Sequence, residues 1–181
     1  MEMIPIFHSD TTPDCMKVTL RKAALKDIPV LRQFEQGLIR DERPFDPTIR
    51  PDPVHYYDME ALVTDPNTHF LMACIDQRAV ASGYATRKTP RHYLDHSAYA
   101  YFGFMYTLPE YRGYGINGRI IAALKQWALG QGLQEMRLTV YPGNQPALRA
   151  YEKVGFSPHL MEMRLREEEG NSEDTTRPSI E

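Results

Sequence analysis

The sequence predicts a mixed α/β domain: a central mixed sheet flanked by about four helices. Strand-like and helix-like apolar periodicities alternate along the chain, two strands are close enough to form a tight hairpin, and a strand–helix–strand unit follows. The hairpin implies antiparallel strands early in the chain, whereas the crossover implies parallel strands late. The predicted strands are 16–23, 69–76, 79–88, 97–108, 135–141 and 158–166, and the predicted helices are 24–40, 53–65, 118–132 and 144–155.

The predicted helices have recognisable ends and faces. In the first, Asp27 is the expected N-cap and Pro29 suits the first turn. In the last, Asn144 is the expected N-cap and Gly155 the C-cap. The apolar face of the first helix consists of Leu31, Phe34 and Leu38, and that of the third consists of Ile120, Ile121, Leu124, Trp127 and Ala128.

The composition is that of a globular protein, with 181 residues of which 42% are hydrophobic and 25% charged. A net charge of −3 gives no general reason to expect nucleic acid as a partner. No apolar run approaches the roughly 20 residues of a membrane helix, and the start lacks the pattern of a secretory signal. Cys15 and Cys74 form no framework pattern, so we expect free thiols in a cytoplasmic protein.

Both ends of the chain are predicted to lie outside the folded domain. Residues 1–15 are expected to form a flexible arm. Residues 167–181 are acidic and almost free of large apolar groups, so burial cannot offset their ordering entropy and we expect a disordered tail. This leaves 16–166 as a single domain.

A glycine-rich stretch, YRGYGINGRII at 111–121, is the first candidate for chemistry. Gly113, Gly115 and Gly118 fit the G-x-G-x-x-G spacing of dinucleotide sites, and the first and last also fit the spacing of a P-loop. In either case a helix N-terminus behind glycines offers unpaired N–H groups to phosphate. A P-loop is disfavoured because Arg-Ile, not Lys-Ser or Lys-Thr, follows the last glycine.

The dinucleotide interpretation also fails on its surroundings. The residues LPEYR separate the strand 97–108 from the first glycine, and Pro109 cannot donate a ladder bond. The next strand, 135–141, ends in Tyr-Pro-Gly without the carboxylate that binds a ribose. The context therefore favours another kind of phosphate cradle.

Two segments, MYTLPEYRGYGINGRIIAALKQWA and LTVYPGNQPALRAYEKVGF, together resemble the GCN5-related N-acetyltransferases (GNAT). Arg112-Gly113-Tyr114-Gly115 matches the family's Arg/Gln-x-x-Gly-x-Gly/Ala motif, except that Asn117 stands at its last position. Asn tolerates unusual backbone angles, so we expect the cradle to survive, with Gly118 supplying slack. The second motif is matched by Asn144, Ala147, Tyr151, Glu152, Gly155 and Phe156.

The resemblance implies an acetyl-CoA-dependent N-acetyltransferase that needs no metal. Its cofactor would lie where the parallel strands 99–108 and 136–141 splay apart, with the pyrophosphate on backbone N–H groups of the glycine loop. The pantetheine would pair with the backbone of Met105 and Thr107, and an N–H near Met105 would polarise the thioester carbonyl. The implied cofactor-binding residues are Met105, Tyr106, Thr107, Arg112, Gly113, Tyr114, Gly115, Ile116, Asn117, Gly118, Asn144 and Tyr151.

Two of these residues also have plain structural interpretations. Tyr151 matches the family's general acid, which protonates the departing thiolate, but an amphipathic helix could equally carry it as a core aromatic. Asn144 matches a position that touches the CoA arm, and it is also a good helix N-cap. The two roles of Asn144 are compatible.

The implied reaction is direct attack of a primary amine on the thioester, which requires a base. Where relatives carry a carboxylate, this chain has Tyr-Phe-Gly-Phe at 101–104 and Thr139. We therefore assign no base. The alternative function is a catalytically weak or inactive acyl-CoA-binding sensor or regulatory module. The remaining candidates for the base are Glu35, Asp41, Glu42, Tyr84, a histidine or a water chain.

The implied acceptor is a small-molecule amine or a peptide or protein amine, and a homodimer is common among such proteins. In relatives, the segment corresponding to 39–47 closes over the acceptor; its charges are Arg40, Asp41, Glu42 and Arg43, and a solvated loop is the alternative. His92 and His96 have a zinc-like spacing only on a helix. Because they lie between two strands, we expect a polar hairpin loop there.

Overall fold

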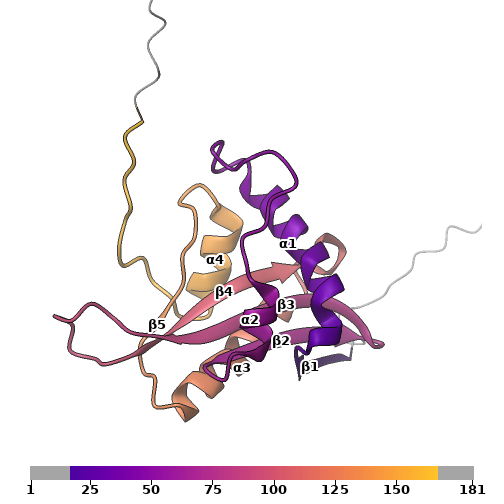
Figure 1. Ribbon diagram of the computed structural model, residues 1–181, viewed down its shortest axis with the longest axis horizontal. Helices are drawn as coiled ribbons and strands as arrows, with labels where there is room; N and C mark the ends of the chain where they lie inside the picture. The colour runs from indigo at the N-terminus through magenta and orange to yellow at the C-terminus, as the bar shows by residue number, and fades with distance from the viewer. Residues whose placement is uncertain (1–16, 167–181) are drawn as a thin grey trace, which may run out of the picture.

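The computed structural model describes residues 17–166, so the expectations for 1–15 and 167–181 lie outside the described residues. Its strands form one five-stranded sheet in the order β1-β2-β3-β4-β5 (Figure 1). Neighbouring strands are antiparallel except β4 and β5, which are parallel. The predicted mixed sheet is therefore confirmed. The strands are β1 (Val18–Lys22), β2 (Thr68–Ile75), β3 (Arg78–Lys88), β4 (Tyr99–Thr107) and β5 (Met136–Arg137).

Helices cover both faces of this sheet. α1 (Ile28–Glu42) and α2 (Met59–Thr64) lie on one face, and α3 (Ile116–Gly130) lies on the other (Figure 1). α4 (Gln145–Lys153) lies beside β4, beyond the short pairing of β4 with β5. Single 3-10 turns, Leu25–Asp27 and Pro109–Tyr111, precede α1 and the glycine loop.

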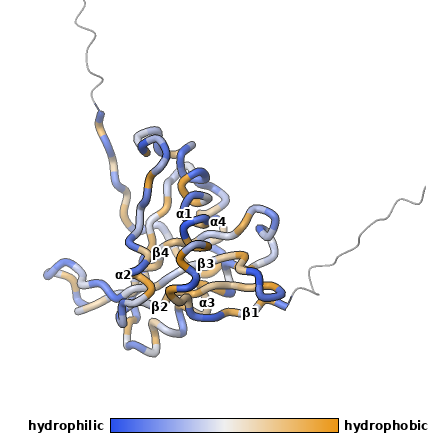
Figure 2. The backbone as a smooth tube through the Cα atoms, turned by 45° about the vertical axis from the view of Figure 1, so that its right-hand side comes forward, coloured by the Kyte–Doolittle hydropathy of each residue, from blue (hydrophilic) through white to orange (hydrophobic). Residues whose placement is uncertain are grey.

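Each face of the sheet carries its own apolar core. Figure 2 shows the hydrophobic colour concentrated along the strands and α3, while the loops are mostly hydrophilic. The α3-side core includes Ala81, Phe102, Ile120, Leu124 and Leu133. The α1-side core includes Leu31, Phe34, Phe70, Tyr84 and Phe104. The buried thiol of Cys74 is free, as predicted.

A β-bulge in β4 changes which face its side chains cover. Ser82 pairs with Tyr106 but Tyr84 pairs with Gly103, so β4 has one residue more than β3 in this interval. Phe104 takes up the irregularity with a φ of +54°. As a result Phe102 packs in the α3-side core, whereas Phe104 and Tyr106 pack in the α1-side core. A bulky residue in the left-handed region costs about 1–3 kcal/mol, a kind of strain that clusters at functional sites.

Several predicted elements differ from the structure. The strand predicted at 158–166 is wrong, because this segment has no ladder partner among residues 17–166 and Leu160, Met161, Met163 and Leu165 are 75–90% exposed. The strand predicted at 135–141 pairs over only two residues, which leaves too short an edge for another strand. The helix predicted at 53–65 is confined to α2, since residues 53–58 form no regular secondary structure.

The predicted helix caps had different outcomes. Asp27 precedes α1, but its carboxylate binds the Arg21 guanidinium at 2.7 Å and the Ala24 N–H at 2.9 Å, not the first turn of α1. Asp27 is therefore the N-cap residue by position, as predicted, but its side chain makes no capping hydrogen bond. Asn144 does cap α4, because its side-chain oxygen accepts the Ala147 N–H at 3.2 Å.

Candidate active site

The parallel strands β4 and β5 separate soon after they meet. They pair only at Ala100↔Met136 and Tyr101↔Arg137. From Gly103 onward, the described residues provide no ladder partner on this side of β4. The bulge lies in this unpaired stretch, which also holds Met105, Tyr106 and Thr107, three of the predicted cofactor-binding residues. Such an edge has main-chain groups free to bind an extended ligand.

The glycine loop follows β4 and leads into α3. Gly113 and Gly115 have φ values of +84° and +74°, which only glycine adopts without strain. Gly115 is the N-cap of α3, and the helix has no side-chain cap and no acidic residue in its first turn. Its first N–H groups therefore lack helical partners and, with the helix dipole, favour an anion. The residues present fit a phosphate group.

The other motif residues have distinct positions around this turn. Ile116 is buried in the α3-side core, and Tyr114 is 43% exposed. Asn117 is helical and not in the positive-φ region, so the expectation that its backbone would need unusual angles is wrong. Gly118 is helical as well and supplies no special angle. The two glycines before α3 make the turn, which leaves position 117 free to hold a side chain.

Arg112 connects the glycine loop to α1. Its Nη2 lies 2.6 Å from the Asp41 carboxylate, and its Nε donates to the Thr107 carbonyl at 3.0 Å. Both charged side chains are more than 40% exposed, so the pair contributes little to the free energy of folding. Its consequence is geometric, because it ties the last turn of α1 to the end of β4.

Tyr151 is on α4 and half-buried. Its ring packs against Phe156 with centroids 6.2 Å apart, and Phe156 packs in turn on Phe102 of β4. Burial, reinforced by the nearby charge of Glu42, raises the pKa of Tyr151 to about 12. A phenol in this state holds its proton at neutral pH and can donate it.

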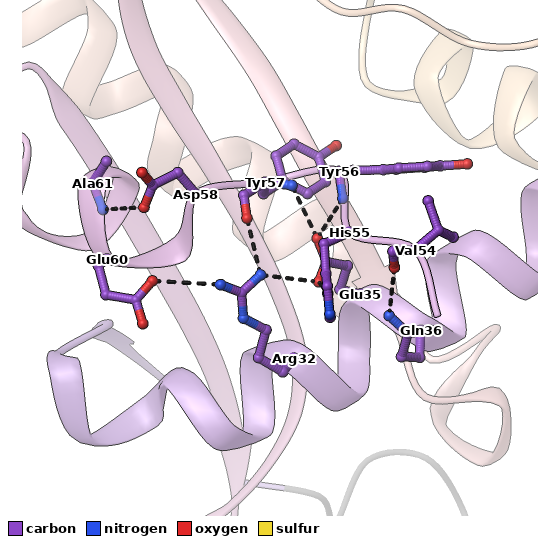
Figure 3. Close-up of polar contacts among 10 residues, drawn as sticks. All are labelled: Arg32, Glu35, Gln36, Val54, His55, Tyr56, Tyr57, Asp58, Glu60 and Ala61. Carbon is purple, nitrogen blue, oxygen red and sulfur yellow. Dashed lines mark hydrogen bonds and ion pairs between the residues drawn. The ribbon is translucent and has the colours of Figure 1, made fainter. Parts of the chain in front are cut away.

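A buried carboxylate positions the segment that leads to α2. Glu35 of α1 is fully buried and accepts hydrogen bonds from the N–H groups of Tyr56 (2.8 Å) and Tyr57 (2.9 Å) (Figure 3). The same carboxylate lies 2.8 Å from His55 Nδ1 and 3.2 Å from Arg32 Nη1. Burial acts to raise its pKa, but these four partners together lower it. Glu35 is thus a structural anion and a poor base.

The anchored segment places aromatic rings over the bulge. Tyr57 packs edge-on against Phe104, with ring centroids 5.1 Å apart, and against Tyr84 at 6.1 Å. Burial raises the pKa of Tyr84 to about 12, which disfavours it as a base. Beyond β5, Tyr141 stacks on Phe45 of the loop after α1. Sequence reasoning missed this wall of rings because its members are scattered along the chain.

The remaining base candidates separate clearly by their surroundings. Asp41 is paired with Arg112. His55 contacts Glu35, His69 stacks on Trp127, and His96 contacts Asp95 and Arg137. Within 17–166 no cluster of three or more His, Cys, Asp or Glu could hold a metal ion. Of the candidate carboxylates Glu35, Asp41 and Glu42, only Glu42 has no ion-pair partner within the same range.

Comparison with known proteins bears on this arrangement. A family model, "Acetyltransferase (GNAT) family", matches residues 35–156, more than half of the chain. The chain belongs to the GNAT family. The family and the class of enzyme predicted from the two motifs together, an acetyltransferase, are thereby confirmed. Within the described residues, no helix is both long and apolar enough to cross a membrane.

Individual GNAT relatives show how similar the chain is to known acetyltransferases and how much of each chain the similarity covers. The chain is 27% identical over 109 residues to aminoglycoside N(6')-acetyltransferase type 1 of Salmonella typhimurium, covering 59% of this chain and 74% of the relative. It is 38% identical over 55 residues to bovine (Bos taurus) thialysine N-epsilon-acetyltransferase, covering 30% and 32%. A solved aminoglycoside N-acetyltransferase, AAC(6')-Iy in complex with CoA, has the same fold, with a TM-score of 0.66, 20% identity and 86% and 98% coverage.

Proposed function

We propose that this protein transfers the acetyl group of acetyl-CoA to a primary amine. One observation carries the proposal: the edge of β4 that β5 leaves unpaired is followed, after a single 3-10 turn, by a glycine turn at the N-terminus of α3, where the first N–H groups are free. An extended arm ending in a pyrophosphate complements both features at once. A solved structure of a fold relative is a complex with CoA, which supports the same class of ligand.

The proposed roles follow the two features. N–H groups from Gly113 through Gly118 bind the pyrophosphate, with Arg112 holding the loop to α1. The backbone of Met105 and Thr107 binds the pantetheine, and an N–H near Met105 polarises the thioester carbonyl. Asn144 caps α4 and contacts the CoA arm. Tyr151 protonates the departing thiolate.

A small-molecule amine is the proposed acceptor class. The aminoglycoside and thialysine acetyltransferases among the relatives support it by their names. A peptide or protein amine is the competing acceptor, and a homodimer in the cytoplasm is the assembly and location we propose. An amine panel that includes an N-terminal peptide separates the acceptor classes, and light scattering measures the assembly.

The test is thiol release from acetyl-CoA with this amine panel. Tyr151→Phe should release thiol about 10²–10⁴-fold more slowly than wild type with the best amine, because a general acid contributes about that much. Tyr93→Phe is the matched control, since Tyr93 is 63% exposed in the loop between β3 and β4. A Tyr151→Phe variant as fast as the control at every pH would exclude the general-acid role.

A second candidate, an acyl-CoA-binding sensor, rests on one contact. Tyr101 and Thr139 occupy positions near which many relatives carry a carboxylate base, and here their hydroxyl groups hydrogen-bond each other at 3.1 Å. A sensor would bind acetyl-CoA but release thiol no faster than buffer with every amine. The same panel therefore decides between the two functions.

A further inference from the structure

Glu42 differs from Glu35 and Asp41 because it has no ion-pair partner within residues 17–166. It is the last residue of α1, next to Asp41, whose side chain binds Arg112 of the glycine loop. Glu42 is half-buried, and its side chain lies near Tyr56, on the segment that Glu35 anchors, so that Tyr56 acts to lower its pKa. Asp41 thus contacts the glycine loop, whereas Glu42 lies near the segment before α2.

The groups around Glu42 come from α1 and the loop after it, the segment before α2, the segment after β5, and α4. Neighbouring charges have other partners: Arg43 pairs with Asp52 at 2.6 Å, and Asp46 binds Thr48 and Arg164. Among residues 17–166, no cation neutralises Glu42. The charged or titratable groups around it are Asp41, Arg43, Asp46, Tyr56, Tyr57, Tyr141 and Tyr151.

This environment raises the pKa of both a carboxyl and a phenol. Burial raises the pKa of Glu42 to about 7; the Tyr56 hydroxyl group opposes this shift and the charge of Asp41 adds to it. Tyr151 is close enough for the charge of Glu42 to help raise its pKa to about 12. A base whose pKa lies near neutral pH, beside an acid that keeps its proton there, suits acid–base catalysis.

We propose that Glu42 is the general base that takes a proton from the acceptor's ammonium group. The inference rests on the proposed acetyltransferase function. The acceptor it implies is a cationic amine whose ammonium lies between a carboxylate and the faces of tyrosine rings, both of which attract a cation. Glu42 thereby fills the role for which the sequence offered no carboxylate at 101–104 or at Thr139.

The protons and bonds balance through two side chains. The ammonium gives one proton to the Glu42 carboxylate, and the neutral nitrogen bonds to the thioester carbonyl carbon. As the carbon–sulfur bond breaks, the thiolate takes the Tyr151 hydroxyl proton. The nitrogen's second proton restores that hydroxyl. One proton leaves for solvent through Glu42, and the products are the amide and the free thiol.

The test compares Glu42→Gln with wild type across pH, using thiol release with the best amine of the panel. Wild-type kcat/KM should rise with pH to a plateau with a midpoint near 7. Glu42→Gln should be about 10²–10⁴-fold slower at pH 7 and should keep rising toward the pKa of the amine itself, because only free amine can then react. Its affinity for acetyl-CoA, measured by calorimetry, should equal that of wild type.

Glu60→Gln is the matched control, because Glu60 is an exposed carboxylate on α2 that pairs with Arg32 at 3.4 Å. It should keep the wild-type plateau and midpoint. An active wild type whose Glu42→Gln variant keeps both its rate and its midpoint near 7 overturns this inference alone. A wild type that binds acetyl-CoA but acetylates no amine overturns the proposed function, and this inference with it.

Discussion

The ring of Tyr57 packs edge-on against the ring of Phe104, with their planes 82° apart. This contact joins the segment before α2 to the bulge of β4, the point at which β4 has left β5. The proposed acceptor side and the proposed acetyl-CoA side of the site therefore share one aromatic contact. The same contact packs the segment that holds Tyr57 against the strained residue Phe104.

A glycine variant of a strand residue is usually less stable than an alanine variant, but at Phe104 we expect the opposite. Phe104→Ala should lower the free energy of unfolding by about 3–5 kcal/mol through the lost ring. Phe104→Gly should lose the same contacts but relieve the strain of a φ of +54°, and should be about 1 kcal/mol more stable than Phe104→Ala. Urea unfolding of both variants measures the difference. An alanine variant that is the more stable of the two would contradict a strained bulge.

Glu35→Gln should lower the free energy of unfolding by about 2–4 kcal/mol at pH 7, because it leaves buried donors poorly satisfied. The folded-state pKa of Glu35 lies below its unfolded value of about 4.3. Its ionised form therefore stabilises the fold above that pH, and the contribution is lost as the pH falls through the folded-state pKa. Denaturant unfolding at several pH values should show the two proteins converging in acid. An equal difference at every pH would exclude an ionised Glu35.

Asn144→Ala should lower the free energy of unfolding by about 1 kcal/mol, since it removes the cap of α4. Asp58→Ala removes the equivalent cap of α2, where the carboxylate accepts the Ala61 N–H at 3.0 Å, and should cost a similar amount. If Asn144 also contacts CoA, acetyl-CoA should bind more weakly to Asn144→Ala and unchanged to Asp58→Ala. Equal affinities in calorimetry would leave Asn144 as a cap alone.

Glu42→Gln should make the protein more stable above pH 7. A carboxyl whose folded-state pKa is raised to about 7 disfavours the fold once it ionises, so its contribution is complete below pH 4 and is lost as the pH rises through 7. After allowance for solvent screening, we expect the variant to gain about 1–2 kcal/mol at pH 8.5 and almost nothing at pH 3.5. Thermal unfolding at both values checks this. A variant less stable than wild type at pH 8.5 would contradict a desolvated Glu42.

The sequence predicted most of this fold because its apolar periodicities are long and regular. The stripe from Ile120 to Ala128 and the run from Tyr99 to Thr107 each give their element by pattern alone. The pattern failed at 158–166, where alternation is present but the sheet edge beside it is only two residues long. Alternation indicates which side chains could share a face, but a strand also needs a partner.

The glycine loop was predictable, whereas the acid–base groups were not. Gly113 and Gly115 could be recognised in the sequence because their backbone has positive φ angles, which favour glycine. By contrast, Glu35 and Glu42 lie seven positions apart on α1 and carry the same side chain. Only the fold shows that one meets two N–H groups, a histidine and an arginine, while the other meets tyrosines and no cation. Partners that are distant in sequence decide such roles.

Calorimetric titration of acetyl-CoA tests the central claim most directly, with two alanine variants beside the wild type. A Cβ at Gly115 or at Gly130 would meet nothing within 4 Å, but only Gly115 has a positive φ. Wild type and Gly130→Ala should bind acetyl-CoA equally at one site, and Gly115→Ala about tenfold more weakly, because alanine there costs about 1–2 kcal/mol. No binding by wild type at millimolar acetyl-CoA, or equal affinity of all three proteins, would contradict a cradle built on this turn.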